Sequence, residues 1–151
     1  MPPRQTESLL RVSSFVVLIG DREIGFAEVS PLSSMAELDL PRAGTRHGGF
    51  APVVLRRALT TSTELYDWRR LYVEGEDEAR DITIRQLSAP GGTVVNQWKL
   101  VGAWPSRWTG PAFDAMSNEI AFEELEVQFD ELVWHGQKPT KKERGRDGRP
   151  A

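Results

Sequence analysis

The sequence of 151 residues contains no cysteine, which excludes a disulfide framework, a thiolate metal site and a cysteine nucleophile. It has only two histidines, His47 and His135, and neither stands in a metal-ligand spacing or beside a nucleophile motif. The longest apolar run, Phe15 to Ile19, is too short to cross a bilayer, so we expect no membrane insertion by the monomer. Residues 1–20 lack the apolar core and cleavage site of a signal peptide, so we expect synthesis in the cytoplasm.

Patterns typical of enzymes are also scarce. The stretch GEDEARD lacks the alternating ligands of an EF-hand, and APGG lacks the Lys-Ser/Thr that follows a phosphate-binding loop. Glu123, Glu124 and Glu126 could supply a carboxylate pair, but nothing indicates the deep cleft and raised pKa that a glycosidase needs. We expect no catalytic residue, cofactor or metal. A small hydrolase on this acidic strand is an alternative, which replacing Glu123 and Glu124 by Gln would test.

The net charge of −3 hides an uneven distribution. From His135 onward the chain has six Lys/Arg and two acids, which makes this segment +4 and leaves −7 for the rest. An acidic body is a poor nucleic-acid binder, because binding phosphates requires a basic surface. The Gly/Pro-rich segment has almost no apolar residues. We therefore predict a folded domain over residues 1–134 and a basic, disordered tail over 135–151.

Most of the domain has the pattern of β-strands. Residues 14–30 predict a hairpin with a Gly20-Asp21 turn and a second strand from Ile24 to Val29. Residues 82–87 and 93–104 predict two more strands, joined by the turn sequence SAPGG. A further strand follows Pro52, and the proline- and glycine-rich stretch before it predicts a long loop or loose hairpin.

One segment, TSTELYDWRRLY, has the pattern of a helix. Thr61 and Glu64 have the spacing of a capping box, which would satisfy free N–H groups at the helix start. Leu65, Trp68 and Tyr72 would form one apolar stripe. The segment therefore predicts an amphipathic helix packed on a sheet.

The C-terminal part of the domain contains a break and a change of phase. WPSRWTGP has two prolines and a glycine, so we predict a corner between two sheets, covered by Trp104 and Trp108, and not a ladder strand. Downstream, apolar residues shift from even positions to odd ones, and we predict a β-bulge at Glu123 and Glu124. Together these features indicate a closed or nearly closed β structure with one helix alongside.

The segment from Ala103 to Val127 resembles the C-terminal signature of the phage tail tube protein family. That signature is similar to A-W-P-[ST]-x-W-x-G-P, a spacer, and N-E-[IV]-A-x-E-x-L-E. The matching residues are Trp104, Pro105, Ser106, Trp108, Gly110, Pro111, Asn118, Glu119, Ala121, Glu123, Leu125 and Glu126. The blocks GFAEVSPLSS and VLRRALTTSTELYDW also resemble the family.

The resemblance implies a mainly β fold with one helix: two near-orthogonal antiparallel sheets that form a barrel or sandwich. It also implies hexameric rings of this chain, stacked into the inner tube of a contractile phage tail or injection system. Implied partners are the sheath, baseplate and cap proteins, with protein cargo or DNA passing through the lumen. The particle would be a phage tail or a released phage-tail-like assembly.

The resemblance also implies roles for individual residues. The loop from Leu32 to Phe50 would reach the adjacent ring. The residues expected to act in ring stacking are Leu38, Leu40, Arg42, Arg46, His47 and Phe50. The residues expected at the structural corner are Trp104, Pro105, Trp108, Gly110 and Pro111. Two alternatives stay open: a tube-initiating or baseplate-proximal ring protein, and a monomeric ligand-binding β-barrel.

Overall fold

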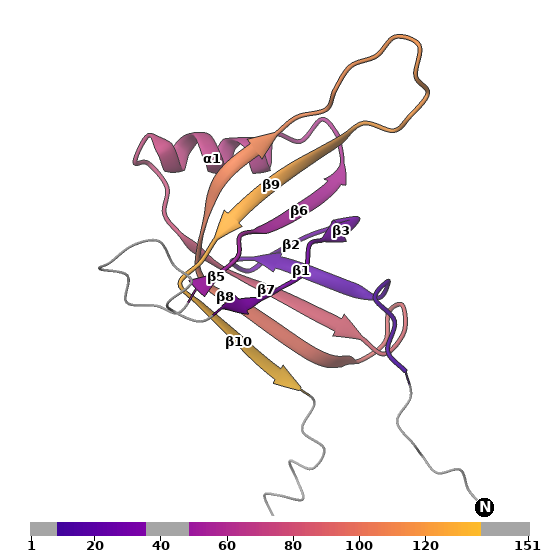
Figure 1. The fold of residues 1–151 in the computed structure, drawn as a ribbon, viewed down its shortest axis with the longest axis vertical. Helices are drawn as coiled ribbons and strands as arrows, with labels where there is room; N and C mark the ends of the chain where they lie inside the picture. The colour runs from indigo at the N-terminus through magenta and orange to yellow at the C-terminus, as the bar shows by residue number, and fades with distance from the viewer. Residues whose placement is uncertain (1–8, 36–48, 137–151) are drawn as a thin grey trace, which may run out of the picture.

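The fold is mainly antiparallel β-structure with one helix, as the sequence predicts. The computed structural model describes residues 9–35 and 49–136 (Figure 1). The elements are β1 (Phe15–Ile19), β2 (Arg22–Ile24), β3 (Glu28–Val29), β4 (Ser34–Met35), β5 (Gly49–Phe50), β6 (Val53–Ala58), α1 (Glu64–Val73), β7 (Arg80–Leu87), β8 (Val94–Thr109), β9 (Phe122–Gln128) and β10 (Glu131–Gly136).

The long strand β8 connects two groups of strands. The strand order is β2-β1-β7-β8-β9-β6-β3, and β10 also pairs with β8. The first half of β8 lies between β7 and β10, whereas its second half pairs with β9. We call β2, β1, β7, β10 and the first half of β8 the β7 sheet. The second half of β8 with β9, β6 and β3 is the β9 sheet.

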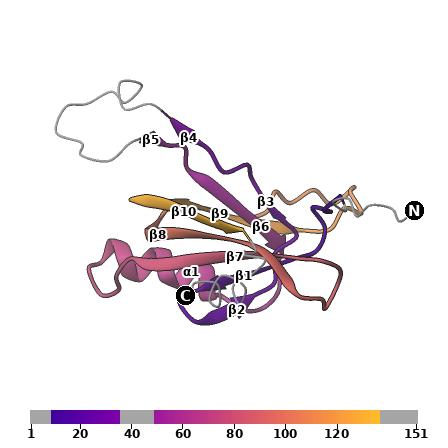
Figure 2. The same ribbon diagram turned by 90° about the horizontal axis from the view of Figure 1, so that it is seen from below.

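The two sheets also approach each other at the ends of the strand order. β2 and β3 are consecutive in the chain and are separated only by residues 25–27, so the sheet curls back toward its own start (Figure 2). No ladder joins β2 to β3 in the described part of the chain. The near-orthogonal angle between the sheets stays a prediction.

The N-terminal hairpin is shorter than predicted. β1 and β2 pair around the predicted turn, where Gly20 has a φ of 64°. The second strand ends at Ile24, however, and does not continue to Val29. β3 pairs with β6 in the other sheet. The alternation of apolar residues predicted a single strand up to Val29. It missed the break because a local pattern does not show where the chain changes its pairing partner.

The helix begins two residues later than predicted. Its N-cap is Thr63, with no side-chain capping bond, so the predicted capping box at Thr61 is wrong. Thr63 Oγ1 instead donates to Asp67 Oδ2 at 2.7 Å. The predicted stripe does face the protein, since Leu65 and Trp68 are buried.

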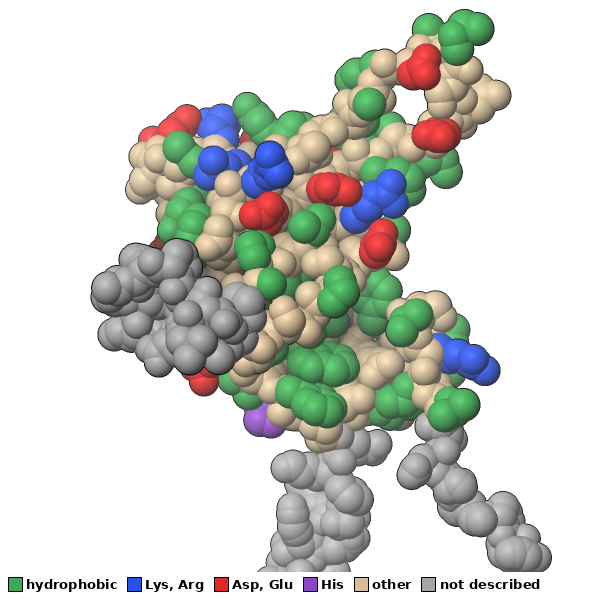
Figure 3. Space-filling model, viewed as in Figure 1, with side chains coloured by type: hydrophobic (Ala, Val, Ile, Leu, Met, Phe, Trp, Pro, Cys, Tyr) green, Lys and Arg blue, Asp and Glu red, His purple; other side chains and the backbone are tan. Residues whose placement is uncertain are grey.

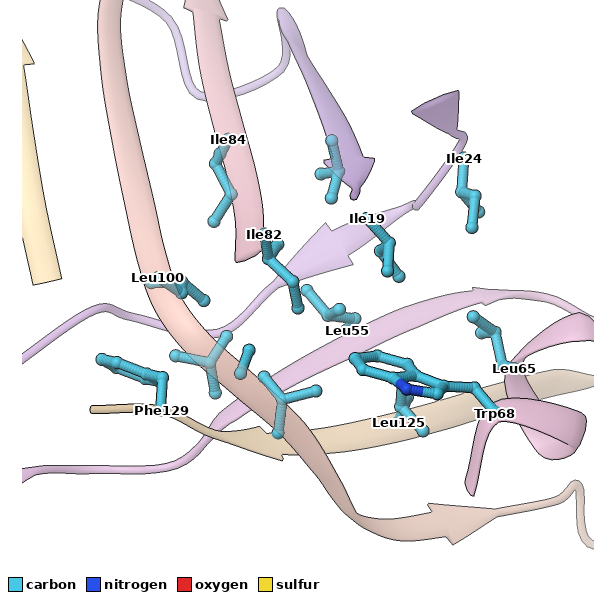
Figure 4. Packing of buried hydrophobic residues seen from close by; sticks show 14 residues of the cluster. Ile19, Ile24, Leu55, Leu65, Trp68, Ile82, Ile84, Leu100, Leu125 and Phe129 are labelled. Atoms are coloured by element: carbon cyan, nitrogen blue, oxygen red, sulfur yellow. The ribbon is translucent and has the colours of Figure 1, made fainter. Parts of the chain in front are cut away.

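The core lies between the two sheets and the helix. In Figure 4, Ile82 and Leu100 of the β7 sheet lie near Leu55 and Leu125 of the β9 sheet. The buried apolar residues are Val17, Ile19, Ile24, Val53, Leu55, Leu65, Trp68, Ile82, Ile84, Leu100, Ala103, Leu125, Val127 and Phe129. Inward side chains alternate along β6 and β9, as expected for sheets with one buried face.

The end of the predicted domain falls within a strand. β10 continues to Gly136, which pairs with Asn96, so His135 and Gly136 belong to the folded part. The predicted boundary after Trp134 is therefore two residues too early. Residues 137–151, which include the rest of the basic tail, lie outside the described residues.

Candidate functional site

The corner predicted at WPSRWTGP is a bend within one continuous strand. β8 runs through Pro105 and Trp108, both paired with β9, so the prediction that this stretch is not a ladder strand is wrong. Along this stretch β8 changes partners, from β7 and β10 to β9. The predicted passage between two separate sheets stays a prediction. The strand bends at Gly102, with a φ of 67°, and at a register shift between Pro105 and Arg107. Proline is tolerated because the ladder between β7 and β8 ends at Ala103, which leaves one side of β8 without a strand.

The predicted bulge at Glu123 and Glu124 is also wrong. β9 pairs with β6 in continuous register through both residues, and the irregularity lies across the ladder, in β8. The apparent change of phase arises because Ile120 belongs to the preceding loop and is 69% exposed. Phe122 begins the strand on its outer face, where the Arg56 guanidinium lies 3.8 Å from the ring centroid.

The helix covers the second half of β8. Trp104 stacks on Tyr72 with ring centroids 5.8 Å apart, and Trp108 meets Tyr66 edge-on at 5.2 Å. Arg69 Nη1 donates to the carbonyl oxygen of Pro105 at 3.3 Å. These contacts hold the helix against the second half of β8, where the ladder with β7 has ended.

A buried charge cluster fastens the helix to both sheets. Arg57 Nε donates to Glu123 Oε2 at 2.6 Å, and Arg57 Nη1 donates to Glu64 Oε2 at 3.0 Å. Glu64 also accepts from Arg22 Nε at 2.6 Å, and Glu123 Oε1 accepts from Trp108 Nε1 at 2.8 Å. Glu123 is only 1% exposed. Within the described residues the remaining Arg57 nitrogen, Nη2, is buried without a hydrogen-bond partner.

The sequence analysis missed this cluster, although the strands contain its signal. Arg57 shares a strand face with Val53 and Leu55. Glu123 likewise shares a face with Leu125, and the two charged residues are directly opposite in the ladder. A basic and an acidic residue on the buried faces of two strands indicate a buried ion pair.

The cluster shifts two pKa values. Burial alone would lower the pKa of Arg57, but its hydrogen bonds to Glu123 and Glu64 outweigh burial and raise it. Burial alone would raise the pKa of Glu64, but hydrogen bonds from Arg22 and Arg57 lower that pKa below the usual glutamate range. Both charged forms are therefore favoured in the folded protein.

This geometry does not support the hydrolase alternative. Glu123 points into the core, where both carboxylate oxygens are occupied by Arg57 and Trp108. Glu124 and Glu126 lie on the opposite face of β9. Within residues 9–35 and 49–136 no group of three or more His, Asp or Glu could hold a metal ion. No helix in these ranges is long and apolar enough to cross a membrane.

The predicted ring-stacking loop is described only at its base. β4 and β5 pair as a short antiparallel ladder, so the loose hairpin predicted there is present at its foot. Phe50 packs against Phe129 with ring centroids 5.2 Å apart. The other residues assigned to stacking, Leu38, Leu40, Arg42, Arg46 and His47, lie outside the described residues.

Two features of the surface are suited to assembly. Among the described strands, β2, β3 and β10 each pair on one side only, so each has an open edge. The loop of residues 110–121, which begins at Gly110 and Pro111, extends far from the body (Figure 1). Its side chains Phe113, Met116 and Ile120 are 88%, 91% and 69% exposed.

A family model for the T4-like virus tail tube protein gp19 matches residues 12–133. The chain belongs to this tail tube family. The match contains the bent strand, the helix and the buried charge cluster, so the signature read from Ala103 to Val127 identified the family correctly. No match was found among curated protein sequences.

Solved structures of injection systems share the tail tube fold. A chain in the PVC sheath-tube complex of an extracellular contractile injection system, in its extended state, is 28% identical, with a TM-score of 0.69; the match covers 87% of this chain and 94% of that one. A chain in the anti-feeding prophage baseplate is 22% identical with a TM-score of 0.72, covering 87% and 98%. Hcp1 from Flavobacterium johnsoniae, at 15% identity, has a TM-score of 0.58 and covers 82% and 96%. The last two likenesses show the fold alone.

Proposed function

We propose that this chain is the structural subunit of the inner tube of a contractile phage tail or extracellular injection system. Six copies form a ring, and rings stack around a lumen through which protein cargo or DNA passes. The family match over residues 12–133 is the observation that carries this proposal. The role is mechanical, since the relatives are tube proteins.

The open strand edges support ring formation. β10 and β2 lie at different margins of the β7 sheet, and each lacks a partner on one side among the described strands. Pairing between edges of neighbouring copies would continue the sheet around a cylinder, and closure would leave no edge to aggregate. The sheath would surround this cylinder, with baseplate and cap proteins at its ends.

Electron microscopy of the purified full-length chain tests the proposal. We expect rings with six-fold symmetry, and stacked tubes at high concentration or with the sheath protein present. Analytical ultracentrifugation should show a hexamer. A chain that sediments as a monomer at every concentration would contradict the proposal and favour the ligand-binding β-barrel.

A tube-initiating or baseplate-proximal ring protein is the second candidate. The likeness to a chain of the anti-feeding prophage baseplate favours it, although at 22% identity that likeness concerns the fold. The copy number per purified particle separates the two roles. A main tube subunit is present in many rings, whereas an initiating protein is present in one or a few.

Ring stacking through the loop between β4 and β5 is part of the proposal. Deletion of residues 36–48 should leave a folded protein that forms rings but does not form tubes, because the deletion removes the segment that reaches the next ring. Negative-stain microscopy would measure this. Long tubes formed by the deletion variant would contradict the assignment of stacking to this loop.

A further inference from the structure

The β7 sheet has an apolar inner face that the other described residues, within 9–35 and 49–136, cover only in part. The register aligns Phe15, Ile84 and Trp98 on the face that also holds the buried Leu100. Beyond Ile84 the space over this face is lined by residues 27–32, around β3, and by no residue of β6, β9 or α1. Trp134 continues it on β10, stacked on Trp98 with ring centroids 5.8 Å apart and 63% exposed.

A surface groove of about 540 Å³ lies over this uncovered part. Its floor comes from the β7 sheet and its wall from the segment around β3. The apolar residues that line this apolar groove include Val12, Phe15, Pro31, Leu32, Ile84 and Trp98, and the acidic Glu28 also lines it. Val12 is 89% exposed at its rim. Arg11 lies beside the groove, because its carbonyl oxygen accepts a hydrogen bond from Gln86, another lining residue.

The loop of residues 110–121 has the complementary chemistry. Its exposed apolar side chains, Phe113 and Met116, lie near its tip, and Figure 3 shows apolar and acidic side chains together on this projection. The loop contains two acids, Asp114 and Glu119, and no Lys or Arg. It also has local order: the Met116 N–H donates to Asp114 Oδ1 at 3.0 Å, and the Glu119 N–H donates to the Ser117 hydroxyl at 3.1 Å.

Groove and loop cannot meet within one copy. Figure 1 shows the loop at one end of the molecule and, at the other, the segment of residues 9–14 before β1 and the free end of β10. They can meet between copies, as a head-to-tail contact in which the loop of one copy enters the groove of the next. Such a contact uses different surfaces on the two copies, so it repeats and closes into a ring when the rotation fits. Charge does not decide this pairing, because Glu28 lines the groove and Arg11 lies beside it. The pairing rests on the match between an apolar groove and the exposed apolar side chains of the loop.

We propose that the apolar groove is the docking site for the 110–121 loop of a neighbouring copy of this chain, with Phe113 and Met116 as the inserted side chains. The inference rests on the proposed function and deepens it, because it names the contact that sets the direction of the ring. Burial of two large apolar side chains in a concave apolar site is typical of the central residues of an interface.

Disulfide trapping in the full-length chain tests this contact, and the absence of native cysteine removes background cross-links. Two single variants, Val12→Cys and Met116→Cys, are purified separately, mixed under assembly conditions and oxidised. Both positions are exposed, at 89% and 91%, so neither change should disturb folding. Val73→Cys, on a residue 60% exposed at the end of α1, replaces Val12→Cys as the control. A disulfide requires Cα atoms within about 7 Å, which random collisions rarely satisfy.

We expect the mixture of Val12→Cys and Met116→Cys to give covalent dimers several-fold faster than either variant alone and than the control mixture. A chain with both substitutions should give a ladder of covalent oligomers. Equal rates in the test and control mixtures would overturn the inference.

Microscopy of the same samples separates the inference from the proposed function. Rings without the specific cross-link would refute the loop–groove contact and leave the tube function standing. The specific cross-link without rings would support the contact and count against the tube. Monomers without cross-links would refute both.

Discussion

The two ends of the molecule differ in how the apolar inner face of the sheet is covered. Bending β8 leaves each sheet with an inner face that extends beyond the other sheet. At the end of the β9 sheet the helix packs against β8 at Trp104 and Trp108, and its Glu64 binds the Arg57 of the buried Arg57–Glu123 pair. At the end of the β7 sheet Trp98 and Trp134 stack on each other, and Trp134 is 63% exposed. One end is therefore completed by contacts within the copy, and the other is the end where we propose that a neighbouring copy docks.

A substitution in the charge cluster at the covered end should have the largest effect on the stability of the fold. Arg57→Met leaves Glu123, only 1% exposed, without its cation, and should lower the free energy of unfolding by about 3–5 kcal/mol. Denaturant unfolding monitored by tryptophan fluorescence measures this. The double variant Arg57→Met/Glu123→Gln should recover most of the loss, because Gln is neutral and still accepts from Trp108. No recovery would mean that packing and not charge dominates at this site.

The two ends can be compared directly with a matched pair of tryptophan changes. Trp68 lies on the buried face of α1 and is 2% exposed. Trp68→Ala should therefore lower the free energy of unfolding by about 3–5 kcal/mol, because it leaves a cavity. Trp134→Ala at the other end should cost at most about 1.5 kcal/mol, since it removes one stacked contact and one exposed hydrogen bond to Asn96. We expect the opposite order for assembly: Trp134→Ala should reduce assembly more than Trp68→Ala does. Sedimentation under conditions in which both variants are folded measures this. Equal losses of stability would contradict the assignment of different roles to the two ends.

The bend between the ends should be sensitive at Gly102. A Cβ there would lie 2.7 Å from Asp130 Oδ2, and the residue has a φ of 67°, so Gly102→Ala should cost about 1–3 kcal/mol. Gly75→Ala is the control: its φ is 79° and nothing lies within 4 Å of the added Cβ. The difference between the two melting temperatures isolates the steric term. A smaller loss for Gly102→Ala would mean that the bend tolerates a side chain.

The smallest expected effect concerns pH at the covered end. The pKa of Glu64 is lowered in the folded protein, so its contribution to stability is present above the unfolded-state pKa and is lost as pH falls through the folded-state pKa. Glu64→Gln should therefore reduce stability at neutral pH and flatten its decline in acid. Unfolding free energies measured from pH 7 to pH 3 test this. If the free energy of unfolding of the variant falls as steeply in acid as that of the unmodified protein, carboxylates other than Glu64 cause the pH dependence.

The sequence predicted those elements that depend on local patterns. The turn at Gly20, the hairpin between β7 and β8, and the stripe of Leu65 and Trp68 follow from positive φ and from the period of apolar residues. The signature around Trp104 and Trp108 was enough to identify the family. Local patterns failed where a strand changed partner, as at β2 and β3. They also failed where a loop residue, Ile120, was counted within a strand.

The sequence alone determined that the chain is mainly β with one helix, lacks cysteine chemistry and belongs among tail tube proteins, because periodicity and a long ordered motif are properties of neighbouring residues. Only the tertiary structure showed that Arg57 meets Glu123 in the core, that β8 bends without breaking, and that the described residues leave one sheet end partly uncovered. These features depend on which strands become neighbours, and pairing between residues far apart in the chain leaves no local pattern strong enough to read.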